Sequence, residues 1–304
     1  MLRKTVSLAA AGVLALTLGA SVGPSAHAQT SAASAACALR LGSVTAAGAH
    51  TSRMINATSP ISIGGVRGTA GVFQPNQVQH TSTFVGTPQG NGESRSGLTV
   101  MSGALYSSSY VVDSQIDPHY PHNNLRVGGG WSNFRWIEES VRLQTGPADY
   151  DRTFLYGQQT DGTLHRWIAR GTGWRKTGGV GGLSTVKSMA LISRTSTYET
   201  FLANTRAGTL ITVTWPTAAF SVPKAATVRG ATWQGFEQLI ATKCGATGTL
   251  LLSIDRDTKS GYLYAVGHAN GQNTVIKSLG KVPMTFSDPQ YFRWAPTNDT
   301  LNGA

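Results

Sequence analysis

Gly130-Trp131-Ser132-Asn133-Phe134 begins a pattern that returns three more times along the chain. Phe134 is followed at equivalent places by Val186, Phe236 and Phe286, in steps of 52, 50 and 50 residues. A second pattern, in which a glycine precedes small and apolar residues, runs in phase with the first and occurs at 103–106, 162–165, 208–211 and 261–264. Repeats of this length indicate a solenoid or a propeller, because each unit exposes an apolar face that only its neighbours can cover.

Between these markers the sequence predicts short strands joined by turns. Residues 153–157 and 163–168 are apolar and β-branched stretches on either side of the turn Thr160-Asp161-Gly162, so we expect a hairpin. The same order recurs at 200–213 and at 250–266. Further strands are expected on the outer side of each unit, as at 188–192. Three to four strands in about 50 residues is the content of one propeller blade.

The hairpin from Thr160 to Trp174 and the segment Gly128–Ile137 resemble the tachylectin-like β-propellers, a family of lectins. The resemblance extends over about residues 97–292. It implies a secreted propeller without enzymatic activity and without a required metal, which binds sugars in shallow sites between adjacent blades. Leu183 and Pro283 stand where other units have tryptophan, so the resemblance does not imply equivalent binding at every blade.

We therefore predict an all-β protein, a β-propeller of five blades of about 50 residues each, with six blades as the alternative. Four blades are expected between residues 97 and 292 and one more from 39–98. The single propeller domain is expected at 39–304, after a signal peptide at 1–28 and a disordered lead-in at 29–38.

The signal peptide is predicted from the first 28 residues. Arg3 and Lys4 precede an apolar stretch from Val6 to Leu18, and Ala26-His27-Ala28 gives the small-x-small pattern of a cleavage site. An uncleaved membrane anchor is the alternative, although the apolar stretch is short for one. We therefore expect a secreted, extracellular protein that is a monomer and has no stable membrane insertion.

The chain is strongly basic, with 25 lysines and arginines against 14 acidic residues and a formal charge of +11. Removing Arg3 and Lys4 with the signal peptide lowers this charge to +9. Such a surface attracts anionic partners, among them anionic polysaccharides, and salt weakens the attraction. Solubility alone is the alternative reason for the charge. The sequence has no clustered basic and aromatic motif, so we do not expect a nucleic-acid partner.

Cys37 and Cys244 are the two cysteines of the chain, and both follow the predicted cleavage site. Exported proteins with an even number of cysteines usually pair them, and only one pairing exists here. A catalytic cysteine is the alternative, but neither residue has an adjacent histidine or a Cys-x-x-Cys motif. We predict a disulfide that ties the N-terminal segment to the third repeat.

Sugar binding needs flat aromatic faces beside amide or carboxylate groups. Trp131 with Asn133, and Trp233 with Gln234, supply such pairs. The other candidates are Asp161 in the hairpin turn and Trp174, which is followed by two cations. The alternative for a tryptophan that recurs in every repeat is that it fills the core between blades.

No catalytic residue is predicted, because the sequence lacks the nucleophile, metalloprotease and phosphate-loop motifs. A glycan-acting hydrolase would need paired carboxylates facing the centre of the propeller, and the candidates are Glu138, Glu139, Asp149, Asp151, Glu199 and Glu237. The best metal-like cluster, His119 and His122 with Asp113 and Asp117, has a loose spacing, so we expect neither a metal nor another cofactor. The sequence thus favours a secreted lectin-like protein that recognises glycans or anionic cell-wall polymers. A glycan-acting hydrolase and a non-catalytic interaction module of the envelope are the alternatives.

Overall fold

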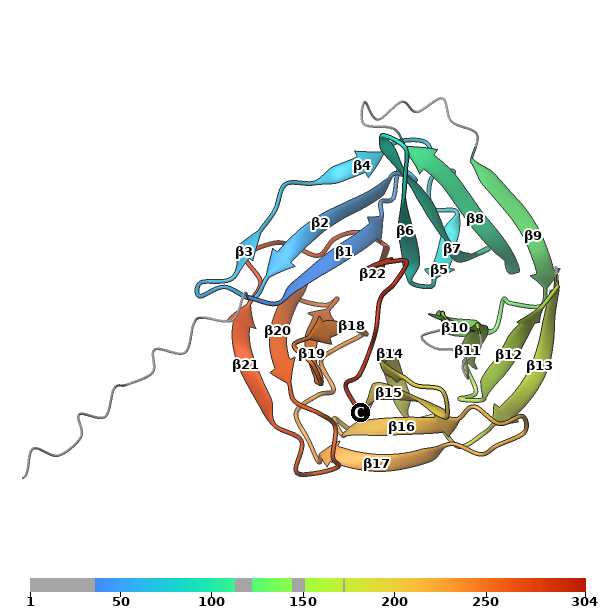
Figure 1. Cartoon of the computed structure of the whole chain (residues 1–304). Coiled ribbons are helices and arrows are strands. Elements are labelled where there is room, and N and C mark those ends of the chain that lie inside the picture. The colour runs from blue at the N-terminus through green and yellow to red at the C-terminus, as the bar shows by residue number, and fades with distance from the viewer. Residues whose placement is uncertain (1–35, 113–121, 144–150, 172) are drawn as a thin grey trace, which may run out of the picture. The chain divides into compact units, whose positions relative to one another are not determined.

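Twenty-two β-strands and no helix make up the described part of the chain, residues 36–112, 122–143, 151–171 and 173–304 of a computed structural model (Figure 1). The all-β prediction is confirmed. Hydrogen bonds join the strands into one ten-stranded sheet and three four-stranded sheets. These residues contain no helix that is long and apolar enough to cross a membrane. The predicted signal peptide lies outside the described residues.

The first sheet follows the order β3-β2-β1-β22-β6-β7-β8-β9, with β4 paired to β2 and β5 paired to β7. Its strands are β1 (Ala38–Val44), β2 (His50–Asn56), β3 (Ser62–Ile63), β4 (Arg67–Thr69), β5 (Val78–Thr81), β6 (Phe84–Gln89), β7 (Gly92–Met101), β8 (Ala104–Val112), β9 (Asn123–Gly129) and β22 (Gln290–Pro296).

The other three sheets are antiparallel and each uses four consecutive strands. The second sheet contains β10 (Phe134–Arg142), β11 (Arg152–Gln159), β12 (Leu164–Arg170) and β13 (Gly173–Val180). The third contains β14 (Val186–Arg194), β15 (Tyr198–Thr205), β16 (Leu210–Pro216) and β17 (Lys224–Arg229). The fourth contains β18 (Gln238–Cys244), β19 (Gly248–Asp255), β20 (Ser260–Val266) and β21 (Ile276–Lys281).

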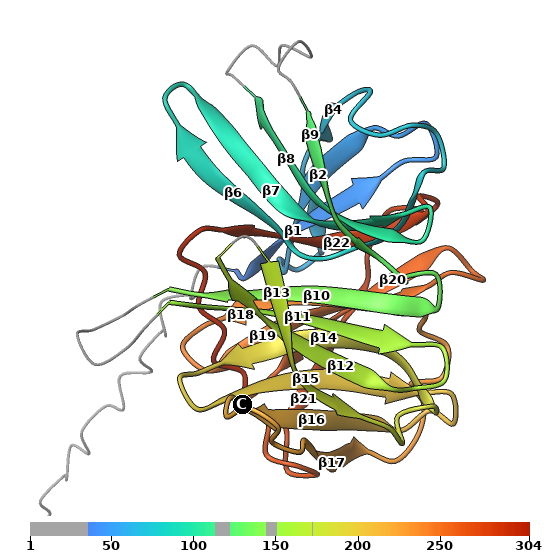
Figure 2. The same cartoon turned by 90° about the vertical axis from the view of Figure 1, so that its right-hand side faces the viewer.

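Strand β22 brings the C-terminal part of the chain into the first sheet. It pairs antiparallel with β1, where Leu41 lies opposite Arg293, and parallel with β6, where Phe84 lies opposite Trp294. Figures 1 and 2 both show β22 next to β1. The sequence predicted that segment 39–98 forms one separate unit, and this prediction is wrong. Residues 38–69 share their half of the sheet with β22, whereas β5 to β9 form the other half.

Apolar side chains fill the spaces between successive sheets. One buried cluster joins the second and third sheets through Phe154 and Phe201, and another joins the third and fourth through Leu202 and Leu251. Three more clusters join the fourth sheet to β1, the two halves of the first sheet to each other, and β7 to β10. Each sheet is thus covered by neighbours, as expected for repeated units whose faces are apolar.

The two repeating sequence patterns lie in contact in the structure. The hairpin turn that contains the glycine of one unit packs against the loop that leads to the next unit. The carbonyl of Gly103 accepts a hydrogen bond from the amide of Trp131 at 2.9 Å, and that of Gly208 accepts one from Trp233 at 3.0 Å. Gly162 has a φ of +89°, and a Cβ atom there would lie 2.1 Å from the backbone nitrogen of Ser184. Glycine is therefore required at this turn by both its conformation and the close approach.

The predicted strand at 188–192 exists, but its position differs from the expectation. It belongs to β14, which is the first strand of the third sheet, and its residues line the pocket described below rather than the outer side of the unit. The outer edge strand of this sheet is β17, which is largely exposed. Strand hydrophobicity identified the element but did not distinguish the two edges of the sheet.

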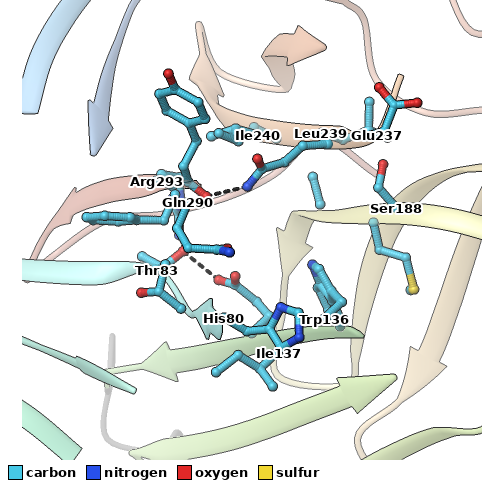
Figure 3. Close-up of a pocket in the computed structure, with 18 of the residues that line it drawn as sticks. His80, Thr83, Trp136, Ile137, Ser188, Glu237, Leu239, Ile240, Gln290 and Arg293 are labelled. Carbon is cyan, nitrogen blue, oxygen red and sulfur yellow. Dashed lines mark hydrogen bonds between the residues drawn. The ribbon is translucent and has the colours of Figure 1, made fainter. Parts of the chain in front are cut away.

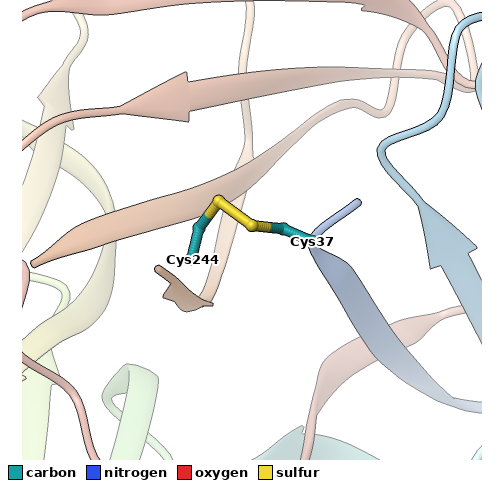
Figure 4. The surroundings of a disulfide bond; sticks show 2 residues. All are labelled: Cys37 and Cys244. Carbon is teal, nitrogen blue, oxygen red and sulfur yellow. A yellow bond between two sulfur atoms is a disulfide. The ribbon is translucent and has the colours of Figure 1, made fainter. Parts of the chain in front are cut away.

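Cys37 and Cys244 form the predicted disulfide, with their Cα atoms 5.4 Å apart (Figure 4). The bond connects the residue before β1 to the last residue of β18, across 207 positions of sequence. Both cysteines pack against the buried cluster between the fourth sheet and β1. The covalent link therefore reinforces an interface that apolar burial already forms.

Candidate functional site

Residues from five strands of the four sheets line one pocket, which has a volume of about 330 Å³ (Figure 3). We call it the inner-strand pocket. Its lining comes from β5, β10, β14, β18 and β22, from residues next to these strands, and from Arg256, which follows β19. The charged or polar side chains of the lining are His80, Thr81, Thr83, Arg135, Glu138, Lys187, Ser188, Glu237, Gln238, Arg256, Gln290 and Arg293.

Glu138 on β10 accepts a hydrogen bond from the hydroxyl of Thr83, with 2.5 Å between the oxygens (Figure 3). Burial raises the pKa of Glu138 above its ordinary value, although the charge of Arg293 and the hydrogen bond from Thr83 oppose this effect. The carboxyl group therefore retains its proton at a higher pH than an exposed glutamate does. A pocket carboxyl of this kind can donate a proton.

Arg293 on β22 is buried and is held by an ion pair. Its Nη1 atom lies 2.5 Å from Oδ2 of Asp299, and its Nε atom lies 3.4 Å from the hydroxyl oxygen of Thr83. Arg194 contacts the same aspartate at 3.6 Å. Asp299 thus bridges two arginines, of which Arg293 lines the pocket.

Lys187, Glu237 and Arg256 form a second charged group. The ammonium of Lys187 pairs with Oε1 of Glu237 and donates to the carbonyl of Gln234. The other carboxylate oxygen of Glu237 accepts the backbone amide of Arg256 at 2.7 Å. The Arg256 guanidinium donates to Oε1 of Gln238 at 3.0 Å. These contacts fix the orientation of the Glu237 carboxylate in the pocket.

Arg135 and His80 complete the polar lining. Arg135 donates to the carbonyl of Val186 at 2.5 Å, so it crosses from the second sheet to the third without pairing with a carboxylate in that contact. Burial, assisted by the charge of Arg256, lowers the pKa of His80 and outweighs an opposing backbone hydrogen bond. His80 is therefore neutral at pH 7 and can both donate and accept a hydrogen bond.

Trp136 supplies an aromatic surface in the pocket. Its indole is half-buried and meets Phe201 edge to face, with ring centroids 5.7 Å apart. Tyr291 and Phe292 also line the pocket, but both are almost fully buried. The inner-strand pocket thus combines carboxyl, guanidinium, amide and indole groups.

The predicted carboxylates separate into different environments. Glu138 and Glu237 line the pocket together, whereas Glu199 is fully buried and pairs with Arg152 at 3.0 Å. Glu139 is half-buried and does not line the pocket, and burial with the charge of Glu138 raises its pKa to about 7. Asp149 lies outside the described residues.

The sequence-predicted sugar-binding residues are not in this pocket. Trp131 and Trp233 are only 8% and 5% exposed, and they pack against Phe134 and Phe236, with centroids 4.3 Å and 5.6 Å apart. Their indole faces are therefore part of the core between sheets. The remaining candidates reach solvent; Asn133, Asp161 and Gln234 are exposed and Trp174 is half-buried.

Sequence reasoning did not identify the pocket as a whole. It named Glu138 and Glu237 but missed Arg135, Lys187, Arg256 and Arg293. One signal was present: a charged residue directly follows three of the repeating apolar positions, at Arg135, Lys187 and Glu237. Asp113, Asp117 and His119 of the metal-like cluster lie outside the described residues. Among the residues that are described, no group of three His, Cys, Asp or Glu side chains is placed to hold a metal ion.

No protein-family model matches the chain, and no curated protein matches it by sequence. Similar solved structures include the α-L-arabinofuranosidase PaAbf62A from Podospora anserina in complex with cellotriose, with 10% identity and a TM-score of 0.45 over 70% of this chain and 71% of that one. They also include AofleA from Arthrobotrys oligospora, with 11% identity and a TM-score of 0.41 over 86% and 73% of the two chains.

One prediction is corrected by this comparison. The expectation that the chain is not an enzyme is contradicted, because a glycoside hydrolase is among the similar structures.

Proposed function

We propose that the described residues of the chain form a five-bladed β-propeller in which β22 completes the blade of β1 to β4. The sequential contacts of the sheets and the five buried clusters between them support this arrangement. The in-phase sequence markers and the resemblance to tachylectin-like propellers support it as well. In this arrangement the inner-strand pocket lies at the centre, where the innermost strand of each blade faces the others.

The function that we propose is carbohydrate binding in the inner-strand pocket. The supporting observation is that one cavity collects carboxyl, guanidinium and amide groups together with the indole of Trp136. Such groups match the hydroxyls and the apolar face of a pyranose. The volume of 330 Å³ lies at the lower end of the range for ligand pockets, roughly 300–1,000 Å³, and suits one or two sugar units.

Export to an extracellular location is part of this proposal. The Cys37–Cys244 disulfide supports it, because such bonds persist in oxidising compartments. The charged residues of the first 28 positions and the cleavage pattern that follows them support it as well. The exposed Asn133, Asp161 and Gln234 with the half-buried Trp174 remain candidates for a second, outer sugar-binding surface.

A glycan array at low and at physiological salt tests binding, since specific recognition survives salt whereas attraction by net charge does not. For a glycan that binds, calorimetry of the variants Glu138→Gln and Glu237→Gln should show at least about tenfold weaker affinity, because each variant removes a hydrogen bond between a carboxyl group and a sugar hydroxyl. Asp257→Asn is the matched control, because Asp257 is exposed and outside the pocket. Unchanged affinity in both pocket variants would place the binding site elsewhere.

Hydrolysis of a glycosidic bond is a second candidate, favoured by the two unlike carboxyl groups in one pocket. Glu138, whose pKa is raised, would donate its proton to the leaving oxygen as the bond from that oxygen to the anomeric carbon breaks. The Glu237 carboxylate would take a proton from the water that attacks this carbon. Release of reducing sugar by the parent protein and its loss in Glu138→Gln would support this candidate. Binding without release would leave carbohydrate binding as the function.

A further inference from the structure

A second concave surface lies between β2 and β4 on one side and the end of β6 with the start of β7 on the other. We call it the arginine groove; it has a volume of about 580 Å³ and shares no lining residue with the inner-strand pocket. Its lining is Arg40, Ser52, Arg53, Met54, Gly64, Gly65, Arg67, Pro88, Gly92 and Glu93. The functions proposed above do not use any of these residues.

Arg40 is held in a fixed position at the groove. Its two Nη atoms lie 2.7 Å and 3.1 Å from the two carboxylate oxygens of Glu93, and its guanidinium carbon lies 4.5 Å from the centroid of the Trp294 ring. A guanidinium has five N–H donors, so this fork leaves three of them for another acceptor. The Arg40 side chain is 29% exposed and can therefore be reached from the groove.

One carboxylate in the groove, that of Glu93, forms ion pairs with two arginines. Glu93 pairs with Arg40 and also with Arg95, whose Nε atom lies 2.9 Å from Oε2. Burial tends to raise the pKa of Glu93, but the hydrogen bonds and charges of the two arginines outweigh it and hold the pKa below its ordinary value. Glu93 is therefore ionised at neutral pH, and the pair of arginines still exceeds it by one positive charge.

Arg67 adds a cation that is not neutralised. It lies on β4 opposite Ser52 of β2 and is exposed. Within the described part of the chain its side chain has no hydrogen bond and no ion pair. An exposed guanidinium on a groove that is already positive attracts an anion, and its planar fork matches a carboxylate.

Besides Ser52 and Arg53, the rest of the groove consists of glycines and apolar side chains. Gly64, Gly65 and Gly92 contribute backbone alone, while Met54, 38% exposed, and Pro88 contribute apolar surface. Sugar rings present C–H groups that pack on apolar surface, and a uronic acid adds one carboxylate to each ring. The combination of two available guanidiniums with an open apolar floor therefore matches a carboxylated sugar chain.

We propose that the arginine groove binds a short oligosaccharide of uronic acid units, with one sugar carboxylate at Arg40 and another at Arg67. The ligand lies along the glycine-lined floor between β2 and the start of β7. This site is separate from the inner-strand pocket and does not depend on the function proposed for that pocket.

Calorimetry of the full secreted protein with trigalacturonate, at 50 and 150 mM salt, tests the proposal. We expect binding by the parent, no binding of the trimethyl ester in which the carboxylates are masked, and about tenfold weaker binding in both Arg67→Gln and Arg40→Gln. Arg170→Gln is the matched control, since Arg170 is an exposed arginine on β12, outside the groove, and it should bind as the parent does.

Three outcomes would overturn the proposal. The first is unchanged affinity in Arg67→Gln, a variant that should fold normally because this side chain is exposed and has no described partner. The second is equal or tighter binding of tripolyphosphate, which would identify a phosphate site. The third is equal binding of hexaglutamate, which would identify a site for acidic peptides. None of these probes is a neutral glycan. A negative result for the arginine groove therefore does not affect the function proposed for the inner-strand pocket.

Discussion

Glu138 and Arg293 are joined through one hydroxyl group, that of Thr83. Thr83 donates to the carboxyl of Glu138 at 2.5 Å and lies 3.4 Å from Nε of Arg293. These three residues come from β10, from the segment between β5 and β6, and from β22. The inner-strand pocket is therefore built by contacts between residues up to 210 positions apart in the sequence.

Glu139 should make the protein less stable at high pH. Its pKa in the folded protein, about 7, lies above the ordinary value of 4.5. The folded state then binds more protons than the unfolded state, so stability is greatest below about pH 4.5 and falls as the pH rises through 7. Glu139→Gln should remove this decline and raise the free energy of unfolding at pH 8 by up to about 2 kcal/mol, because its half-exposed position screens part of the effect. Urea unfolding at pH 5 and pH 8 measures the free energy of unfolding of both proteins. An equal change between the two pH values in parent and variant would contradict the prediction.

Removal of one member of the Arg152–Glu199 pair should destabilise the fold strongly. The two side chains are 2% and 0% exposed, and Ser140 also donates to Glu199. Glu199→Gln should lower the free energy of unfolding by about 3–5 kcal/mol, because it leaves the arginine charge buried and unpaired. The double variant Arg152→Met with Glu199→Met should recover much of that loss. Chemical unfolding of all three proteins measures this, and a loss below about 1 kcal/mol in the single variant would contradict the expectation.

Loss of the disulfide should lower stability without changing the fold. The bond closes a loop across 207 positions, and in the chain-entropy model a loop of this size stabilises the folded state by about 4–5 kcal/mol. The double variant Cys37→Ser with Cys244→Ser should therefore melt at a lower temperature while keeping the far-ultraviolet spectrum of β-structure. The parent measured in reductant is the control and should reproduce the shift. A variant with the same melting temperature as the parent would show that apolar burial alone holds this interface.

Trp131 and Trp174 should respond differently to truncation. Trp131 is 8% exposed and lies in the core between β7 and β10, so Trp131→Ala should cost about 3–5 kcal/mol and lower the melting temperature sharply. Trp174 is half-buried at the edge of the same cluster, and Trp174→Ala should cost less stability. If Trp174 belongs to an outer sugar-binding surface, its truncation should also weaken binding on a glycan array. Binding equal to that of the parent would remove Trp174 from that surface.

The sequence by itself determined the elements of the fold. The alternation of apolar residues, the glycine turns at 103, 162 and 208, and the period of about 50 residues predicted the hairpins that the structure contains. These signals are local, since a strand and its turn depend on residues within a few positions of one another. The disulfide was also predictable, because two cysteines allow one pairing.

Only the tertiary structure decided which distant strands pair and which side chains the neighbouring sheets bury. The pairing of β22 with β1 and β6 divides the segment 39–98 between two halves of one sheet. The burial of Trp131 and Trp233 also follows from the sheets that cover them, because the same residue pattern serves a core or a binding surface. The pocket carboxyls and arginines were invisible as a group for the same physical reason: their contacts join strands that are far apart in sequence, and a local pattern carries no information about which strands meet.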